Sequence, residues 1–352
     1  MAGPLQGIVV LDLSRILAGP WATQLLADYG AEVLKVEHPQ GGDDTRKWGP
    51  PYLQDTAGGA TRESAYYLSA NRGKRSLAID FSRPEGQALV RQLAAQADVL
   101  VENFKVGGLA RYGLGYDELA ALNPRLVYLS ISAFGQDGPD AAKPGYDAMI
   151  QGMGGLMSIT GVPDGEPGAG PQKVGVAVAD LMCGMYAVSA ILAALYERDR
   201  SGRGQYIDLS LLDTQVAWLA NQNLNYLVSG QAPRRQGTAH PNIVPYQCFE
   251  TADGHLILAV GNDGQFARFC AAAGAPEMAA DPRFATNTDR VAHRAELVPA
   301  VAALCRRRTT REWIEALEVA QVPCGPINDL AQVFAEPQVR HRGLRVELPH
   351  PL

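Results

Sequence analysis

The feature that most constrains the fold is a long apolar segment at residues 174–196, in which Asp180 is the only charged residue. Its length would allow it to span a bilayer. However, Gly175 and Gly184 interrupt the segment, and an Asp near the centre of a membrane span costs about 3 kcal/mol. We therefore predict a buried strand followed by a buried helix, with Asp180 at the junction, and we expect no membrane partner.

The composition is that of a folded, soluble protein. A chain of 352 residues that is 47% hydrophobic can bury a large core, and its length favours two domains. The net charge of −6 argues against nucleic acid as a partner, because phosphate-binding domains usually carry a basic excess. Five cysteines without a C-x-x-C pair argue against a disulfide framework or a metal site. Met1-Ala2-Gly3-Pro4-Leu5 does not begin a signal peptide, so we expect a cytoplasmic location.

Short apolar runs alternate with helical segments over the first part of the chain. The sequence predicts buried strands at residues 7–13, 31–37, 76–81, 98–102, 126–133 and 206–209. A helix between the first two would begin near Pro20 and end at Gly30, and a capping box at Ser82-Arg83-Pro84-Glu85 would open another. Repeated βαβ units build a parallel sheet, so we predict an α/β fold with a Rossmann-like large domain over residues 1–227.

The pattern changes near residue 228. Residues 254–260 predict a strand, and residues 266–273 and 290–306 predict helices. We predict a smaller α+β domain over residues 228–330. Residues 331–352 would be the start of a C-terminal segment that returns toward the large domain.

Glu37 ends the second predicted strand, where a dinucleotide-binding protein places the acid that binds a ribose. The loop at residues 14–20 lacks the G-x-G-x-x-G spacing that lets a pyrophosphate approach the helix N-terminus. We therefore predict no nicotinamide or flavin site and place Glu37 on a solvated rim.

A second candidate group is basic and polar. It comprises Arg72, Lys74, Arg75, Asn103, Phe104 and Arg111, which lie close to the ends of predicted strands. Loops at the carboxyl ends of the strands border the ligand crevice of a doubly wound sheet. Arg and Lys together suit phosphate groups. The residues alone leave two interpretations open, a site for a small anionic ligand and a solvated charged rim.

Asp180 is the third candidate, and it also has two interpretations. As a helix N-cap it would contribute about 1 kcal/mol. As a carboxylate among apolar neighbours, it would have a pKa that burial raises and that helix N–H donors lower. A poorly hydrated but ionised carboxylate is a strong nucleophile. The two roles are compatible in position.

Together these residues resemble the class III CoA-transferase family, which includes formyl-CoA, carnitine and dicarboxylate CoA-transferases. The resemblance covers essentially the whole chain. It rests on Leu13-Ser14-Arg15-Ile16-Leu17-Ala18-Gly19-Pro20, Gly30-Ala31-Glu32-Val33-Leu34-Lys35-Val36-Glu37, Asn71-Arg72-Gly73-Lys74-Arg75-Ser76, Val101-Glu102-Asn103-Phe104, Pro144-Gly145-Tyr146-Asp147, Asp180, Gly202-Arg203-Gly204-Gln205 and Pro323-Cys324-Gly325-Pro326-Ile327.

The resemblance implies an enzyme that uses an acyl-CoA and a carboxylic acid as substrates, with no permanently bound cofactor. Asp180 would attack the thioester to give a mixed anhydride and CoA thiolate, which would then convert the anhydride to an aspartyl-CoA thioester. The acceptor carboxylate would reverse these steps. Such chemistry needs positioning and the exclusion of water.

The resemblance also implies which residues contact CoA. They are Arg15, Ile16, Leu17, Ala18, His38, Lys74, Arg75, Asn103, Phe104, Arg111, Lys143 and Tyr146. Some members have an Arg at the position of His38. Where other members carry a mobile glycine-rich loop, this chain has Gly237-Thr238-Ala239-His240, so His240 is a candidate lid residue.

Two alternatives to a transferase remain. An α-methylacyl-CoA racemase, from the same superfamily, uses a His in a Gly-His-Asp motif. This chain has Gly145-Tyr146-Asp147, and a Tyr with a pKa of about 10 is a poor base at neutral pH, which favours the transferase. A non-catalytic CoA-binding protein, with Asp180 only as a helix cap, is the other alternative.

Motifs late in the chain are most similar to those of dicarboxylate-using members. They are Gly237-Thr238-Ala239-His240, Val260-Gly261-Asn262-Asp263-Gly264-Gln265-Phe266 and Gly325-Pro326-Ile327-Asn328. We therefore expect succinyl-CoA or another dicarboxylyl-CoA as donor and a dicarboxylate such as glutarate as acceptor. The resemblance further implies an interlocked homodimer. Members usually continue for a few dozen residues beyond Leu352, so we expect a C-terminal segment that is naturally short or missing.

Overall fold

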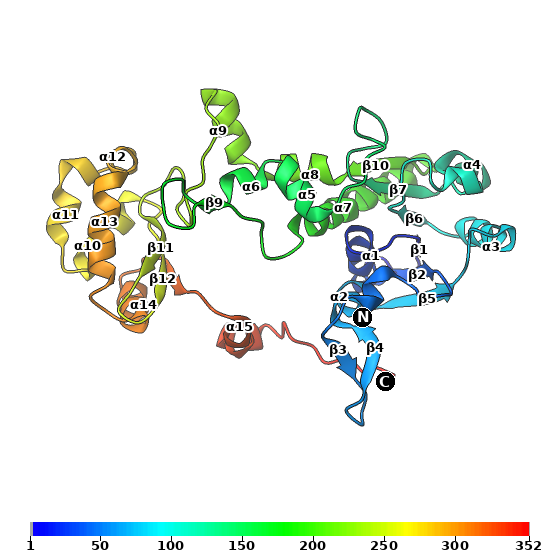
Figure 1. The fold of residues 1–352 in the computed structure, drawn as a ribbon, viewed down its shortest axis with the longest axis horizontal. Coiled ribbons are helices and arrows are strands. Elements are labelled where there is room, and N and C mark those ends of the chain that lie inside the picture. The colour runs from blue at the N-terminus through cyan, green and yellow to red at the C-terminus, as the bar shows by residue number, and fades with distance from the viewer. Residues whose placement is uncertain (1–2, 352) are drawn as a thin grey trace. The chain divides into compact units, whose positions relative to one another are not determined.

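The computed structural model describes residues 3–351, which divide into two compact units (Figure 1). The larger unit contains the residues up to Gly161 together with Pro171–Arg234, and the smaller unit contains Val162–Gly170 and Arg235–Pro351. Met1, Ala2 and Leu352 lie outside the described residues, so the first two residues of the predicted large domain and the last residue of the predicted C-terminal segment are not described.

The boundary between the units differs from the predicted one at residues 227/228. The chain passes into the smaller unit at Arg235, and the earlier loop Val162–Gly170 belongs to that unit as well. Arg235 explains this grouping, because its Nε donates to the Val162 carbonyl over 3.1 Å and its guanidinium pairs with Asp164. Sequence patterns could not predict a contact between segments so far apart. The short strands β8 (Gly161–Val162) and β9 (Gly170–Pro171) lie where the chain passes between the units.

A six-stranded parallel sheet forms the centre of the larger unit. In spatial order its strands are β10 (Tyr206–Ser210), β7 (Val127–Ser132), β6 (Val99–Glu102), β1 (Val9–Asp12), β2 (Glu32–Glu37) and β5 (Lys74–Ala78). Each strand lies near its predicted position. The chain order reverses at β1, whose neighbours are β2 and β6. In a doubly wound sheet, this switch point is where a ligand crevice opens.

Helices and a hairpin complete the larger unit. They are α1 (Ala18–Asp28), α2 (Ala65–Asn71), α3 (Pro84–Ala94), α4 (Tyr116–Leu122), α5 (Asp147–Met153), α6 (Leu156–Ile159), α7 (Val178–Ser201), α8 (Leu211–Trp218), α9 (Asn221–Ser229), the 3-10 turns Asp44–Lys47 and Ala110–Tyr112, and the hairpin β3 (Tyr52–Gln54) and β4 (Ala60–Ser64). As predicted, α1 ends before Gly30, which has a φ of 97°. The predicted capping box of α3 was wrong, because the Ser82 hydroxyl donates to Asp80 over 2.6 Å and Arg83 precedes the helix without a side-chain cap.

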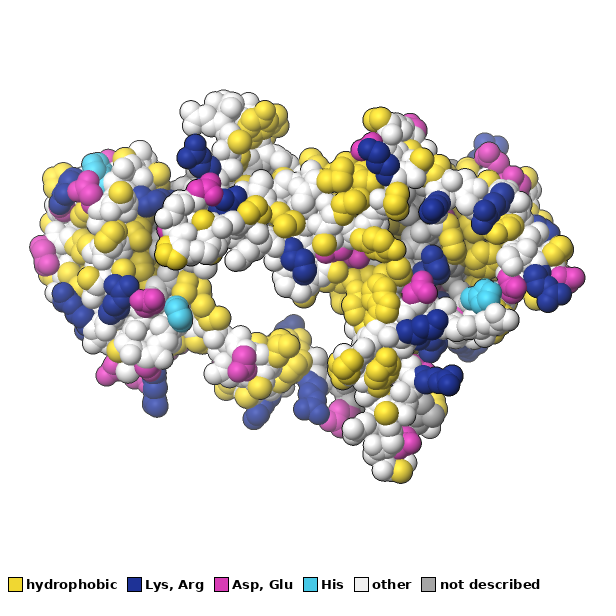
Figure 2. Space-filling view, viewed as in Figure 1, with side chains coloured by type: hydrophobic (Ala, Val, Ile, Leu, Met, Phe, Trp, Pro, Cys, Tyr) yellow, Lys and Arg dark blue, Asp and Glu magenta, His cyan; other side chains and the backbone are white. Residues whose placement is uncertain are grey.

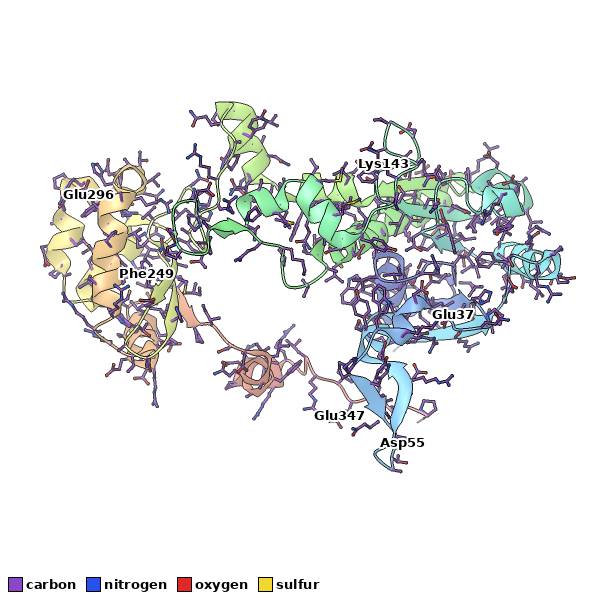
Figure 3. The ribbon with its side chains drawn as sticks, viewed as in Figure 1. Glu37, Asp55, Lys143, Phe249, Glu296 and Glu347 are labelled. Carbon is purple, nitrogen blue, oxygen red and sulfur yellow. The ribbon has the colours of Figure 1, made fainter. Side chains whose placement is uncertain are left out.

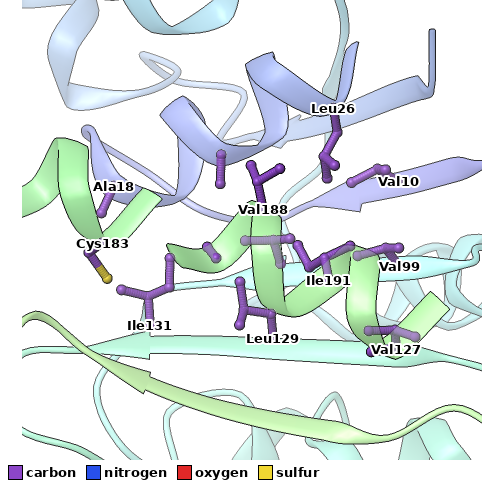
Figure 4. Packing of buried hydrophobic residues seen from close by; sticks show 14 of the residues in the cluster. Val10, Ala18, Leu26, Val99, Val127, Leu129, Ile131, Cys183, Val188 and Ile191 are labelled. Carbon is purple, nitrogen blue, oxygen red and sulfur yellow. The ribbon is translucent and has the colours of Figure 1, made fainter. Parts of the chain in front are cut away.

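Helix α7 corrects the prediction for the apolar segment. Residues 174–177 form no strand, and the helix begins at Val178. One of its faces packs against α1 and the sheet, as Figure 4 shows for Cys183, Val188 and Ile191. Gly184 allows this close approach, because a Cβ there would lie 2.8 Å from the Ala18 carbonyl oxygen. The helix is long and apolar enough to span a membrane, and half of its most apolar window is buried within the protein.

The smaller unit packs helices around a three-stranded antiparallel sheet. The sheet contains β11 (Tyr246–Glu250), β12 (His255–Ala259) and β13 (Cys324–Pro326). The helices around it are α10 (Asp263–Ala272), α11 (Pro276–Ala280), α12 (Asn287–Ala292), α13 (Arg294–Cys305) and α14 (Thr310–Val319), with a 3-10 turn at Pro282–Phe284. The last two helices, α15 (Leu330–Ala335) and α16 (Pro337–His341), contact each other, and none of their residues is buried. The single helix predicted at residues 290–306 is interrupted at His293.

Candidate functional site

A cavity of about 470 Å³ opens in the larger unit, at the carboxyl ends of β1, β6 and β7. This is the edge of the sheet at which the switch point predicts a ligand site. Most of the predicted site residues meet there. They are Arg15, Ile16, Leu17, Ala18, Asn103, Phe104, Arg111, Lys143, Tyr146 and Asp180.

Asp180 is the third residue of α7 and lines this cavity. Within residues 3–351 its carboxylate accepts no hydrogen bond, so it does not cap the helix. Burial, with a further contribution from the nearby carboxylate of Asp147, raises the pKa of Asp180 to about 7. A carboxylate that is poorly solvated and unpaired in this way is basic and free to attack an electrophile.

Asp147 caps the start of α7 in place of Asp180. Its Oδ1 accepts a hydrogen bond from the Ala179 amide over 2.8 Å and lies 3.5 Å from the Asp180 amide nitrogen. In the sequence Asp147 stands out only as part of the Pro144-Gly145-Tyr146-Asp147 motif, and its role at the start of α7 was not predicted. The available signal was the spacing of Asp147 and Gln151, an i,i+4 pair at the start of α5.

The loop between β1 and α1 has a strained backbone. Ile16 adopts a φ of 70°, which is rare for a β-branched residue. Its amide donates to both carboxylate oxygens of Asp43, over 3.1 and 3.3 Å. Asp43 in turn pairs with Lys35 over 3.1 Å, and both side chains are buried. This buried ion pair holds the loop in the shape that borders the cavity.

Asn103 also holds this loop. The Arg15 amide donates to Asn103 Oδ1 over 2.8 Å, and Asn103 Nδ2 donates to the Arg15 carbonyl over 2.7 Å. The amide of Asn103 is therefore occupied by the Arg15 backbone. Asn103 directly follows β6, so these two hydrogen bonds connect the loop after β6 to the loop after the adjacent strand β1.

Aromatic rings support two of the cavity's cations. The Arg15 guanidinium lies 5.3 Å from the centre of the Phe104 ring, and the Arg111 guanidinium lies 4.6 Å from that of Tyr112. Arg15 also pairs with exposed Asp44 over 3.2 Å. Such stacked guanidiniums keep their donors available in the plane of the group, as phosphate binding requires.

Two lysines add to the positive charge of the cavity. Lys143 lies on the loop that projects before α5 and pairs with Asp140 over 2.5 Å (Figure 3). Lys105 lines the cavity and is exposed, although it was not predicted. A signal for Lys105 was present, because it directly follows the Asn103-Phe104 motif. The cavity therefore combines a basic mouth with one unpaired carboxylate.

The comparisons with known proteins fit this geometry. The profile of CoA-transferase family III matches residues 5–352. The chain belongs to this family. This CoA-transferase is 56% identical over 345 residues to succinate–glutarate CoA-transferase of Agrobacterium fabrum, covering 98% of this chain and 85% of that protein. It is 44% identical over 348 residues to succinyl-CoA:glutarate CoA-transferase of Homo sapiens, covering 99% and 77%.

A solved structure supports the same conclusion. The crystal structure of a CAIB/BAIF family protein from Brucella suis has a TM-score of 0.86 and 51% identity, covering 98% of this chain and 89% of that one. The prediction of an α/β enzyme with a large parallel sheet is thus confirmed at this level. The prediction of a CoA-transferase is also confirmed, in preference to a racemase or a non-catalytic CoA-binding protein.

The structure does not bring Lys74 and Arg75 of this CoA-transferase to the cavity. Lys74 is buried, with its Nζ 3.0 Å from Asp12 Oδ2 and 2.9 Å from the Pro20 carbonyl oxygen. Burial lowers the pKa of Lys74 to about 8, although Asp12 opposes this shift. Arg75 is exposed and pairs with Glu32 over 2.8 Å. Both belong to the start of β5, at the opposite end of that strand from its carboxyl-terminal loop.

His38 borders a second, smaller cavity of about 190 Å³. The two cavities share Arg15, Phe81 and Phe104 as lining residues, so His38 lies beside the main cavity. His38 Nε2 is 3.9 Å from Asp80 Oδ1. His240, in the smaller unit, stacks on Tyr246.

Glu37 does not lie on a solvated rim as predicted. It is buried and accepts hydrogen bonds from Arg46, Tyr67 and Ser76. Burial alone would raise its pKa, but the hydrogen bonds from Arg46, Ser76 and the Asp43 amide, above all the one from Arg46, lower the pKa of Glu37 to about 2. In this CoA-transferase Glu37 therefore belongs to the core beside the site. Within residues 3–351 no group of three or more His, Cys, Asp or Glu is arranged to hold a metal ion.

Proposed function

We propose that this CoA-transferase moves CoA from succinyl-CoA to glutarate through covalent intermediates on Asp180. The substrates are supported by the names of the Agrobacterium fabrum and Homo sapiens relatives, at 56% and 44% identity. The observation that carries the mechanism is the unpaired carboxylate of Asp180 in a cavity with a basic mouth.

In the first half-reaction an Asp180 oxygen attacks the succinyl thioester carbonyl. The carbon–sulfur bond breaks, so a mixed anhydride forms and CoA leaves as the thiolate. The thiolate then attacks the aspartyl carbonyl of the anhydride, which forms an aspartyl-CoA thioester and releases succinate. A glutarate carboxylate attacks this thioester, so the carbon–sulfur bond breaks, CoA leaves again as the thiolate and a second mixed anhydride forms. The thiolate then attacks the glutaryl carbonyl of this anhydride, which forms glutaryl-CoA and frees the Asp180 carboxylate. No net proton is transferred, so catalysis depends mainly on positioning the reacting groups and on excluding water from the intermediates.

The cavity lining suits each part of an acyl-CoA. Arg15, Lys105, Arg111 and Lys143 supply cations for the phosphates of CoA. Ile131, Ala133 and Leu211 supply apolar surface on the same cavity as Asp180. Apolar walls limit the access of water, which would otherwise hydrolyse the anhydride.

We also infer a homodimer. The family resemblance implies that its two subunits are interlocked. Large apolar side chains gather on the outer face of the larger unit over α7 and on α9 (Figure 2). They are Met149, Met153, Met185, Tyr186, Leu192, Tyr196, Leu224, Tyr226, Leu227 and Val228. Large exposed apolar side chains in such number favour a protein–protein interface. The Rossmann-like character of the larger unit is supported by its strand order, and the cytoplasmic location stays a prediction.

Trapping the intermediate tests the proposal. The purified protein is incubated with succinyl-CoA and quenched with hydroxylamine or borohydride, and its peptides are analysed by mass spectrometry. We expect an adduct on Asp180, and we expect Asp180→Asn to lose about 10³-fold or more in transfer rate. Asp44→Asn, which removes an exposed carboxylate near the cavity mouth, is the control and should retain the adduct. Full activity in Asp180→Asn would refute the covalent mechanism.

A panel of donors and acceptors tests the substrates separately. We expect the highest kcat/KM with succinyl-CoA as donor and glutarate as acceptor. A preference for monocarboxylates would contradict the substrate proposal while leaving the mechanism intact.

A further inference from the structure

We propose that Asp147 is a positioning residue for the nucleophile: its carboxylate fixes the first turn of α7 and keeps a second negative charge beside Asp180. This inference rests on the proposed role of Asp180. Asp147 does not line the cavity, and its side chain is only 9% exposed, so it acts on Asp180 from behind the cavity wall.

The hydrogen bonds of Asp147 account for both of its oxygens. Oδ1 accepts from the Ala179 amide over 2.8 Å, and Oδ2 accepts from Gln151 Nε2 over 2.7 Å. Gln151 is fully buried, and its Oε1 accepts from the Val174 amide over 2.9 Å. Asp147 and Gln151 therefore clamp the loop before α7 as well as its first turn. Two side chains of α5 therefore fix, by hydrogen bonds, the backbone that carries Asp180.

The same geometry has an electrostatic consequence. The N-terminus of a helix favours a negative charge, and an Asp in the first turn is normally stabilised in its ionised form. Here Asp147 takes the amide hydrogen bond, while Asp180 accepts none within residues 3–351. The carboxylate of Asp180 is thus left basic. Burial raises the pKa of Asp180 to about 7, and Asp147 contributes to the same shift.

Other groups around Asp180 belong to several elements. Tyr66 on α2 interacts with both carboxylates, and its pKa is raised by burial, by Asp180 and by Asp147. On α7 itself, burial raises the pKa of Cys183 to about 12, so it stays protonated in the range of interest. The cations that line the same cavity are Arg15, Lys105, Arg111 and Lys143. Among these groups, Asp147 is the one that adds to burial in raising the pKa of Asp180.

The test compares variants that separate the charge of Asp147 from its support of the backbone. Asp147→Asn removes the charge and keeps a side-chain oxygen that can accept from the Ala179 amide, whereas Asp147→Ser removes the charge and shortens the side chain. Gln151→Met keeps the charge of Asp147 and removes the clamp to Val174. For each folded variant, kcat/KM with succinyl-CoA and glutarate is measured from pH 5.5 to 9, and Asp180 adducts are measured as above.

For the wild type we expect kcat/KM to rise with pH through a midpoint near 7, as Asp180 ionises. In the neutral variants the midpoint should move down by about 1 pH unit, because a neighbouring negative charge has been removed. The plateau should fall about tenfold, because a less basic carboxylate is a weaker nucleophile. The wild-type advantage should therefore grow as pH rises. Gln151→Met should lower the rate without moving the midpoint.

The outcomes distinguish this inference from the proposed function. If the neutral variants keep the wild-type midpoint, or if neither of them folds, Asp147 is a structural residue only and the proposal is overturned. If the wild type itself forms no Asp180 adduct, the covalent mechanism fails instead.

Discussion

Asp147 on α5 and Asp180 on α7 both lie at the N-terminal end of α7, but they differ in chemistry because they differ in hydrogen-bond partners. Both oxygens of Asp147 accept hydrogen bonds, whereas the Asp180 carboxylate accepts none within residues 3–351. A carboxylate whose two oxygens both accept hydrogen bonds has fewer lone pairs free to attack an electrophile. Asp180 is therefore the better nucleophile, although both lie at one helix end.

An unpaired, poorly solvated carboxylate also lowers stability, which leads to a prediction for Asp180→Asn. The pKa of Asp180 is about 7 in the folded state against an ordinary 3.8. Between these pH values the folded protein retains a proton that the unfolded chain has lost, so stability falls as pH rises, and above pH 7 the loss is complete. Asp180→Asn should therefore be more stable than the wild type at pH 8, on the order of 2 kcal/mol and several degrees in Tm.

Thermal unfolding at pH 4.5 and pH 8 checks this prediction. The stability difference between Asp180→Asn and the wild type should shrink strongly at pH 4.5. Asp199→Asn, which removes an exposed carboxylate near the far end of the same helix, serves as the control and should change Tm at pH 8 much less than Asp180→Asn does. A wild type that is more stable than Asp180→Asn at pH 8 would contradict the unfavourable burial of this carboxylate.

At the scale of elements, the loop between β1 and α1 shows how strain is held next to the site. Ile16 keeps its left-handed conformation because its amide is bound by buried Asp43, which is paired with Lys35. For residues with a Cβ this conformation costs roughly 1–2 kcal/mol, whereas Gly adopts it freely.

Substitutions at Ile16 test this strain. We expect Ile16→Gly to be more stable than Ile16→Ala by about 1 kcal/mol, because only Ala keeps the left-handed penalty. Ile16→Gly should nevertheless raise the KM for succinyl-CoA several-fold, because Ile16 lines the cavity and the loop gains freedom. Thermal unfolding and steady-state kinetics measure the two effects. An Ala variant that is the more stable of the two would show that the loop is unstrained.

Helix α7 illustrates why sequence patterns could not fix where an element begins. A short apolar run such as residues 174–179 is compatible with a buried strand or a buried helix, since both bury all their side chains. The amide of Val174 is bound by Gln151, and that of Ala179 is bound by Asp147. These contacts come from another helix and decide where α7 begins.

At the scale of the whole molecule, the outer apolar surface predicts assembly. We expect the protein to be a dimer by light scattering. A double change of Leu227→Asp and Val228→Asp on α9 should weaken the dimer, because the two apolar side chains are 72% and 86% exposed. Leu89→Asp, an exposed apolar residue on α3, is the matched control and should leave the dimer intact. Dimers of unchanged stability in the double variant would place the interface elsewhere.

The sequence by itself determined the fold class, the nucleophile candidate and most of the cavity lining. Strand and helix periodicity is local, so the positions of β1, β2, β6 and β7 and the loops that follow them could be predicted. The resemblance identified the class of enzyme, which the family profile confirms.

Only the tertiary structure decided which side chains are free and which are occupied. Lys74, Glu37 and Asn103 have residue types that suit a ligand, yet Asp12, Arg46 and the Arg15 backbone occupy them. Asp147 and Asp180 are 33 residues apart, and folding places them at one helix end. Partners such as these are distant in sequence, and burial makes each pairing strong, so the chemistry of a side chain depends on contacts that no local pattern contains.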